Sequence, residues 1–542
     1  MNKSTFGNFI ERPRNLYIID FLIVLPFLVL PLLVKLPFRV NIFLSWEGAY
    51  RLSIGQVPFQ DFGMPMGFGF WLIPTLFFKI FGPTFATLVK AEVFINFLSL
   101  AALRGMLYNL RVKPLIITLA LLVFALTYVI YNFWPWYNHS VVVYEMIAIY
   151  FLTLYSSGKS TGKNLFAAIM AGIFTFLALY TKQDVGGICL LFSLFLLVYV
   201  LWRDNAWVPL VAYLGSFGVV ALLLIWPFAD DGFFYWFNYG QSPHDSRITL
   251  GALLDVIFAQ SIVEKVYLIL LIGGLFLSVP SFREFFADQK LFFVTAICAL
   301  MITQSMVTRV SSPLPTDHMT YFHAFGFVGA ALFLPWDKWK ESVLNVAVAL
   351  LVVGFIFSTG TWKYVSGMIP AKGNADAVQA QPAAAPWVEG SLPTFRRVLI
   401  PAGTNQGIER LMALPLIKKE GLKVLNMSEL TPLAYEAGFE PATGTPLWFH
   451  MNVGMFQKEV DEINQRLRDG YYDIVLFEHI KSLPTFYPLV IQNELKRLYF
   501  HFDTFPAPRK LEDGTIEVFI RPDLADQFGL RAAGGLTTAD PE

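Results

Sequence analysis

Residues 209–228 read PLVAYLGSFGVVALLLIWPF, a run without a single charged side chain. A helix of about 20 apolar residues is long enough to cross the hydrocarbon core of a bilayer. The whole chain has 542 residues, of which 56% are hydrophobic and only 15% charged, and its mean hydropathy is +0.55. This composition is typical of a chain that is largely solvated by lipid. We therefore expect an α-helical polytopic membrane protein.

Similar apolar runs recur through the first two thirds of the chain and predict about eleven transmembrane helices. They lie near residues 16–36, 83–107, 115–134, 140–157, 165–181, 187–202, 209–228, 266–282, 291–307, 320–335 and 343–362. The first run is too long for the core of a signal peptide and lacks a small-residue cleavage pattern, so we expect it to be retained. The aromatic segment 67–82 is expected to form an interfacial or re-entrant helix.

The positive charges predict the orientation of these spans, because Lys and Arg collect on cytoplasmic loops. With the spans above, the basic residues fall on alternate loops: Arg12 and Arg14; Arg104, Arg111 and Lys113; Lys159 and Lys163; Arg203; Arg283 and Lys290; Lys338 and Lys340. The N-terminus is then cytoplasmic, and loops 37–66, 135–139, 182–186, 229–265 and 308–319 are extracytoplasmic. The two cysteines, Cys189 and Cys298, lie in apolar runs, which leaves no disulfide framework. This and the charge contrast between the loops suit a bacterial inner membrane, with a eukaryotic internal membrane as the alternative.

The last third of the chain has a different composition. Residues 1–370 form the expected transmembrane domain, and an Ala, Pro and Gln-rich linker follows at 371–391. Beyond it, residues 392–523 are expected to form an extracytoplasmic α/β domain, with strands near 397–400, 422–426, 472–477 and 516–520 and helices near 406–419, 460–468 and 484–498. Residues 512–515 read as a hairpin turn, and residues 524–542 as a disordered tail.

The first outer loop contains two carboxylates and an arginine among aromatic residues. Glu47 and Arg51 lie in the stretch SWEGAYRL (45–52), and Asp61 follows in GQVPFQDFG (55–63). A carboxylate in a partly dry site can act as a general base on a hydroxyl, with its pKa set by burial and by a nearby cation. The alternative is structural: Glu47 pairs with Arg51 one helical turn away, and Asp61 caps a turn. Both interpretations stay open at this point.

This loop resembles that of the GT-C superfamily of polytopic glycosyltransferases, including the protein O-mannosyltransferase and aminoarabinose transferase branches. The similarity is in an acidic residue after the first span (Glu47), the stretch GQVPFQDF (55–62), the segment from Pro65 to Trp71, and FGP at 81–83. A short TKQD turn at 181–184 and a C-terminal α/β domain fit as well. The family's acidic residue is usually Asp, so either Glu47 or Asp61 is the candidate base.

The resemblance implies a polyprenyl-phosphate-linked sugar as donor and a hydroxyl on a glycan, lipid or protein as acceptor. The leaving phosphate needs cationic donors. The candidates at the outer face are Arg51, Lys182, Arg247 and Arg309, with Asp184 and His318 as further substrate-binding candidates. For Lys182 the alternative is that the side chain simply reaches the interface. Asp230 and Asp231 form an acidic pair without a third ligand, so the sequence makes no prediction about a divalent metal.

Two other classes of function are weighed against a glycosyltransferase. A transporter or flippase of a lipid-linked sugar requires ionisable groups near the middle of the bilayer and often an internal repeat, whereas the ionisable residues found here cluster in outer loops and the spans are unpaired. A non-catalytic receptor or scaffold leaves the first loop unexplained. The 40 basic and 40 acidic residues cancel, so no nucleic acid is expected as a partner.

Overall fold

The computed structural model describes residues 13–39, 42–157, 161–230, 232–237, 248–312, 320–339, 342–358, 360–362, 386–481, 485–508 and 514–530. The chain divides into two compact units. The first, called the helical unit here, comprises Met1–Leu33, Ala91–Pro227 and Ser246–Pro370. The second, called the mixed unit, comprises Val34–Lys90, Phe228–Asp245 and Ala371–Glu542. The first outer loop thus belongs with the C-terminal part and not with the expected domain 1–370.

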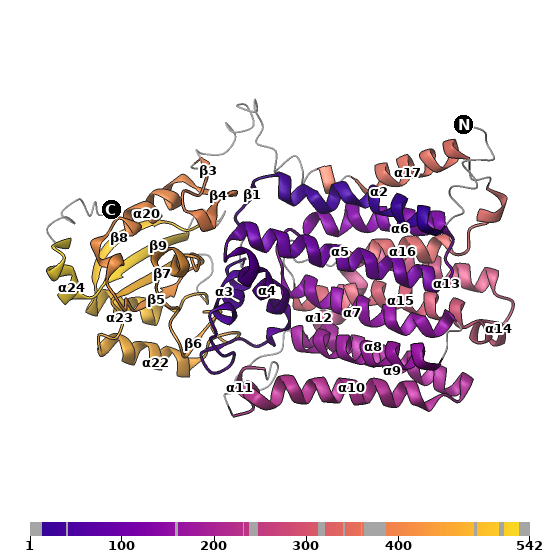
Figure 1. Ribbon diagram of the computed structural model, residues 1–542, viewed down its shortest axis with the longest axis horizontal. Helices are drawn as coiled ribbons and strands as arrows, with labels where there is room; N and C mark the ends of the chain where they lie inside the picture. The colour runs from indigo at the N-terminus through magenta and orange to yellow at the C-terminus, as the bar shows by residue number, and fades with distance from the viewer. Residues whose placement is uncertain are drawn as a thin grey trace. The chain divides into compact units, whose positions relative to one another are not determined.

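Every one of the predicted apolar stretches contains a helix. These helices are α2 (Pro13–Leu33), α5 (Phe85–Asn109), α6 (Pro114–Thr127), α7 (Tyr137–Thr153), α8 (Thr161–Thr181), α9 (Gln183–Asp204), α10 (Trp207–Ile225), α13 (Ile262–Ser278), α15 (Gln289–Ser311), α16 (Phe322–Ala331) and α17 (Val343–Phe357). Figure 1 shows α7, α8, α9 and α10 running alongside one another, and α8 packs against both α7 and α10.

Length and composition decide which helices can cross a membrane. Within the described ranges six are long and apolar enough, and a seventh is added if the pair Leu250–Gln260 and Ile262–Ser278, bent by 76°, is one span. Helix α16, with 10 residues, covers only about 15 Å at 1.5 Å per residue. The polytopic membrane class is confirmed, whereas the number of eleven spans stays a prediction.

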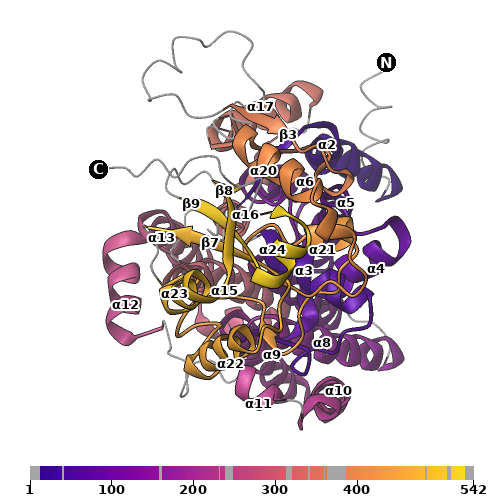
Figure 2. The same cartoon turned by 90° about the vertical axis from the view of Figure 1, so that its left-hand side faces the viewer.

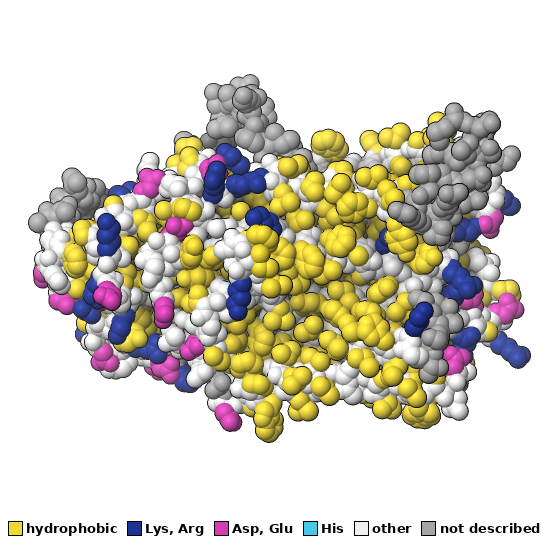
Figure 3. All heavy atoms as spheres, in the orientation of Figure 1, with side chains coloured by type: hydrophobic (Ala, Val, Ile, Leu, Met, Phe, Trp, Pro, Cys, Tyr) yellow, Lys and Arg dark blue, Asp and Glu magenta, His cyan; other side chains and the backbone are white. Residues whose placement is uncertain are grey.

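The surface of the helical unit is apolar. Large side chains of α10 and α17 are exposed, among them Leu223 at 66% and Phe355 at 83%. Figure 3 shows hydrophobic side chains over the flank of this unit. Water-soluble proteins rarely expose contiguous apolar patches of this kind, so this flank faces lipid. Inside the unit, a continuous core of buried aliphatic and aromatic side chains includes Met106, Phe124 and Met301.

Loops predicted on opposite sides of the membrane lie at opposite ends of helix α9. Helix α9 begins directly after Lys182 and ends at Asp204, so Lys182 and Arg203 are a helix length apart. At the Arg203 end, Arg203 Nη1 donates a hydrogen bond of 2.7 Å to Gln289 Oε1. Loops that the charge pattern assigns to one side of the membrane therefore meet at one end of the unit. The direction of the chain across the membrane stays a prediction.

The C-terminal part folds around a four-stranded sheet in the order β5-β7-β9-β8. Strand β5 (Val424–Met427) is parallel to β7 (Ile474–Ile480), and β9 (Gly514–Ile520) is antiparallel to both β7 and β8 (Phe500–Pro506). Figure 2 shows strands β7, β8 and β9 with helices α22 (Gln457–Arg468) and α23 (Leu489–Leu498) beside them. Helix α20 (Ala402–Met412) packs against β8. The predicted α/β fold is confirmed, and β8 is a strand that the sequence analysis missed.

The first outer loop adds strands of its own to the mixed unit. The loop contains α3 (Ile42–Ser53), and α4 (Leu72–Phe81) follows it in the segment predicted as an interfacial helix. Strand β1 (Leu36–Pro37) pairs in parallel with β4 (Val398–Pro401), which also pairs with β3 (Trp387–Glu389). Strand β2 (Phe62–Gly63) pairs in parallel with β6 (Thr445–Pro446). Backbone hydrogen bonds therefore join the loop to the C-terminal part at two places.

The expected C-terminal tail begins later than predicted. Residues Pro522–Gln527 form helix α24, and Leu524, Ala525 and Leu530 are buried, so the expectation of disorder from 524 onward is wrong up to residue 530. These apolar side chains gain more by packing than a solvated tail would. Residues 531–542, most of the linker (371–385), and the turn residues 512 and 513 lie outside the described residues.

A close approach at Gly63 provides a test of the mixed unit. A Cβ atom there would lie 1.9 Å from Trp236 Cε2, and Trp236 is buried at the end of α11 (Phe233–Trp236). We expect Gly63→Ala to destabilise the protein by about 1–3 kcal/mol through overpacking. Gly187→Ala in α9, where nothing lies within 4 Å, is the matched control and should not destabilise. Thermal unfolding in detergent measures both, and equal unfolding temperatures for the two variants would contradict this packing.

Candidate functional site

Glu47 and Arg51 form a buried ion pair on helix α3. They are four residues apart, which places them on the same face of the helix. Arg51 Nε and Nη2 donate hydrogen bonds of 2.9 and 2.7 Å to Glu47 Oε1. The side chain of Arg51 is only 4% exposed and that of Glu47 only 9%. The contact is the one expected under the structural interpretation of Glu47, and it also places a cation beside a buried carboxylate.

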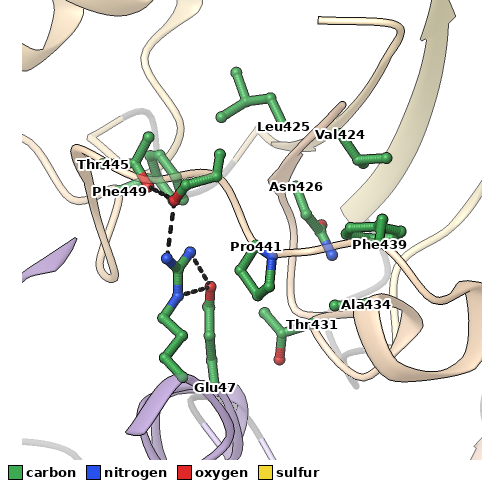
Figure 4. Close-up of a pocket in the computed structure, with 12 residues that line it drawn as sticks. Glu47, Val424, Leu425, Asn426, Thr431, Ala434, Phe439, Pro441, Thr445 and Phe449 are labelled. Carbon is green, nitrogen blue, oxygen red and sulfur yellow. Dashed lines mark hydrogen bonds and ion pairs between the residues drawn. The ribbon is translucent and has the colours of Figure 1, made fainter. Parts of the chain in front are cut away.

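The remaining donors of Arg51 reach the C-terminal part of the same unit. Arg51 Nη1 donates to Gln56 Oε1 at 2.9 Å and to the Ala442 carbonyl at 2.8 Å. Gln56 Nε2 donates to the neighbouring Pro441 carbonyl at 3.0 Å. Figure 4 labels Glu47 and Pro441 and marks the hydrogen bonds between the residues drawn with dashed lines. Arg51 thus fixes the position of Glu47 relative to the C-terminal part.

The pair lines a small cavity of the mixed unit. Its other walls include Asn426, Thr431 and Phe439, as Figure 4 shows. The space inside is about 10 Å³, which suits about one water molecule. A sugar can reach Glu47 in this cavity only if neighbouring side chains move.

Burial dominates the electrostatics of Glu47. Removal from water raises the pKa of the Glu47 carboxyl above its ordinary value, while the positive charge of Arg51 and its hydrogen bonds act in the opposite direction. A raised pKa brings a carboxylate closer to the range in which it can accept and return a proton near neutral pH.

Asp61 braces a turn. Its Oδ2 accepts a hydrogen bond of 2.7 Å from the Val57 amide, and its own amide donates to the Val57 carbonyl at 2.9 Å. The Asp61 carbonyl accepts from the Gly444 amide at 2.7 Å, next to the β2–β6 pairing. These contacts agree with the capping interpretation of Asp61, because its side chain stabilises the turn.

A second polar cluster lies in the helical unit at the break between α8 and α9. Lys182 Nζ contacts Ser311 Oγ at 3.0 Å, Ser312 Oγ at 3.3 Å and Asp184 Oδ2 at 3.1 Å. Both charged side chains are 10% exposed. Asn138, in the first turn of α7, donates to Ser312 Oγ at 3.0 Å. The ends of α7, α8 and α15 thus meet here.

The sequence pattern indicates Lys182 and Asp184 but does not indicate Asn138, Ser311 or Ser312. The available signal was weak: all three are polar residues within or beside loops predicted to be extracytoplasmic. Their convergence depends on helix packing, because α7 and α15 are far apart in the sequence.

Arg309 is the third candidate cation whose contacts the structure gives. Its guanidinium forms an ion pair with Glu264, which is 1% exposed. Among the described residues, Arg51, Lys182 and Arg309 are therefore each neutralised by a carboxylate. Arg247 and His318, the other two candidates for substrate binding, lie outside the described residues.

The helical unit contains buried carboxylates that were not expected, among them Glu92 and Glu145. Glu92 in α5 pairs with His139 Nε2 at 3.1 Å, and Glu145 in the middle of α7 accepts a hydrogen bond of 2.6 Å from Gln304 Nε2. The expectation that ionisable groups are confined to outer loops is wrong for both. Among the described residues no group of three or more His, Cys, Asp or Glu side chains could hold a metal ion; Asp231 lies outside them.

Comparison with known proteins identifies the fold. No protein-family model matches the sequence, and no curated protein matches it either. Among solved structures, ArnT from Cupriavidus metallidurans in the apo state is 10% identical and matches 93% of this chain and 97% of its own, with a TM-score of 0.52. ArnT bound to undecaprenyl phosphate is 11% identical, with coverages of 94% and 98% and a TM-score of 0.50.

A third similar structure is the oligosaccharyltransferase of Archaeoglobus fulgidus in complex with zinc and sulfate. It is 13% identical, with coverages of 91% and 72% and a TM-score of 0.41.

The chain therefore shares the fold of ArnT, which agrees with the polytopic architecture and the C-terminal α/β domain expected from the sequence. It is similar to ArnT over nearly its whole length. At 10–11% identity, this similarity indicates a shared fold but does not assign a role to any single residue.

The Glu47–Arg51 pair makes a prediction about pH. In Arg51→Met the pKa of Glu47 should rise further, because burial remains and the neighbouring cation is lost. A raised carboxyl pKa means that the folded state binds more protons, so stability falls as pH rises above the ordinary value of 4.5. We expect Arg51→Met to cost about 3–5 kcal/mol near pH 7 and clearly less near pH 5.

Unfolding free energies in detergent at the two pH values measure this effect. The double variant Glu47→Gln/Arg51→Met is the control and should lose the extra pH dependence. An equal cost of Arg51→Met at both pH values would contradict a buried, ionised Glu47.

Proposed function

We propose that this chain is a membrane glycosyltransferase that moves a sugar from a polyprenyl-phosphate donor to an acceptor hydroxyl at the extracytoplasmic face. The observation that supports it most is the likeness to ArnT, which covers 97–98% of that chain and includes a structure bound to undecaprenyl phosphate. The apolar flank of the helical unit suits an isoprenoid donor that stays dissolved in the bilayer. The acceptor is a glycan, lipid or protein, and the membrane is the bacterial inner membrane with the N-terminus in the cytoplasm.

The chemistry requires a base for the acceptor. In the proposed reaction a carboxylate takes the proton of the acceptor hydroxyl, the oxygen attacks the anomeric carbon, and the bond from that carbon to the phosphate oxygen breaks. Glu47 is the better candidate for this base, because it is buried, lines a cavity and adjoins a cation. The Asp61 carboxylate already accepts a hydrogen bond from the Val57 amide within a turn. Arg51 is then a positioning residue that orients Glu47.

The leaving phosphate requires cations and hydroxyl donors. Lys182 offers an ammonium group at one end of the helical unit. The hydroxyl oxygens of Ser311 and Ser312 lie 3.0 and 3.3 Å from Lys182 Nζ and offer two further donors. Arg309, two residues before Ser311 on α15, offers a second cation. We assign the donor phosphate to Lys182 and these serines, with Arg309 as a further ligand.

A transporter or flippase of a lipid-linked sugar is the rival proposal. It is favoured by one observation, the buried carboxylate of Glu145 in the middle of α7, since ionisable groups inside membrane helices often mark transport paths. A transporter would move the intact donor across the bilayer without breaking the sugar–phosphate bond.

Sugar transfer from a synthetic polyprenyl-phosphate donor by the purified protein in lipid vesicles distinguishes the two proposals. We expect turnover by wild type and a loss of at least about 100-fold in Glu47→Gln, because a general base contributes about 10²–10⁴. Asp61→Asn keeps an oxygen for the Val57 amide and should retain most activity.

The folded state of each variant is checked by its unfolding temperature, and donor binding is measured in parallel. Loss of activity in Asp61→Asn with full activity in Glu47→Gln would move the base to Asp61. Translocation of intact donor without cleavage would overturn the transferase proposal.

A further inference from the structure

Lys182 is fully engaged by the protein itself. An ammonium group has three N–H donors, and three oxygens lie within 3.3 Å of Lys182 Nζ: Ser311 Oγ, Ser312 Oγ and Asp184 Oδ2. Asp184 is equally engaged. Its Oδ2 also accepts a hydrogen bond of 2.5 Å from Ser311 Oγ, and its Oδ1 accepts one of 2.7 Å from the Val185 amide.

A carboxylate and a phosphate compete for the same donors. Both present negatively charged oxygens that accept hydrogen bonds from ammonium and hydroxyl groups. Since Asp184 Oδ2 contacts both Lys182 Nζ and Ser311 Oγ, a phosphate can take those two donors only if Asp184 Oδ2 gives them up.

The surroundings of Asp184 favour renewed pairing of its carboxylate with Lys182 after a phosphate leaves. It lies in the first turn of α9, where the helix dipole favours a negative charge. Lys182 and Asp184 are only 10% exposed, so an unpaired charge on either would be poorly solvated. When a phosphate leaves, the carboxylate is the nearest group that can neutralise Lys182.

We propose that Asp184 is an internal competitor for the donor phosphate, which weakens phosphate binding at Lys182 and speeds release of the polyprenyl-phosphate product. This inference rests on the proposed function, because it assigns the phosphate to Lys182. It gives Asp184 a role opposite to that of a ligand: its removal strengthens binding of the lipid phosphate and slows turnover by retaining the product.

The affinity of the purified full-length protein for polyprenyl phosphate in detergent tests this role. In Asp184→Asn the competing charge is gone, while an oxygen remains for the Val185 amide. We expect binding tighter by roughly tenfold or more, with a lower kcat in the transfer assay. Asp184→Ser is a second variant that removes the charge with a different side chain and should change affinity in the same direction.

Asp20→Asn is the matched control. Asp20 forms a buried ion pair with Arg104 at 2.7 Å in the same helical unit, between α2 and α5, and has no proposed part in ligand binding. Its affinity for polyprenyl phosphate should equal that of wild type. Lys182→Gln should bind weakly, and adding Asp184→Asn to it should not restore tight binding.

The outcomes separate this inference from the proposed function. Weak binding by Lys182→Gln together with unchanged or weaker binding by Asp184→Asn would overturn the competitor role alone. Equal tightening in Asp20→Asn would also overturn it, since the effect would then follow from any lost ion pair. Failure of wild type to bind polyprenyl phosphate would overturn the proposed function as well.

Discussion

Neutralisation of buried charge is the constraint on which both candidate sites depend. Removing a charged group from water is costly unless a partner of opposite charge lies beside it. Arg51 lies against Glu47, Lys182 against Asp184 and Arg309 against Glu264. Each pair holds its members in a defined place before any ligand arrives. Under the proposed function, a phosphate that binds at Lys182 therefore has to displace the Asp184 carboxylate.

The first outer loop shows how the mixed unit gives a carboxylate a fixed position. Two short parallel pairings, β1 with β4 and β2 with β6, join the loop to the C-terminal part. Arg51 adds a side-chain hydrogen bond to the Ala442 carbonyl, and Tyr235 of outer loop 229–265 donates to Glu459 Oε1 at 2.9 Å. In this unit the C-terminal α/β part is a brace for two outer loops. Substitutions in strands β1, β2, β4 or β6 should therefore change the position of Glu47, although these strands do not contain Glu47.

The sequence predicted features that depend on local pattern and missed those that depend on distant pairing. Apolar runs located the helices, and strands β4, β5, β7 and β9 followed from β-rich stretches. The i,i+4 spacing of Glu47 and Arg51 and the turn at Asp61 were foreseen as alternatives, because both are local. Strands β1 and β2 have two residues each and pair with segments more than 350 residues away, which no periodicity reveals. The serines beside Lys182 are hidden for the same reason.

The decisive measurement is a structure of the protein in lipid nanodiscs with polyprenyl phosphate bound. We expect phosphate density within hydrogen-bond distance of Lys182 Nζ and Ser311 Oγ, with the Asp184 carboxylate turned away from both. We also expect the isoprenoid chain to lie along the apolar flank of the helical unit. Phosphate bound elsewhere, with the Lys182–Asp184 contact intact, would contradict this expectation.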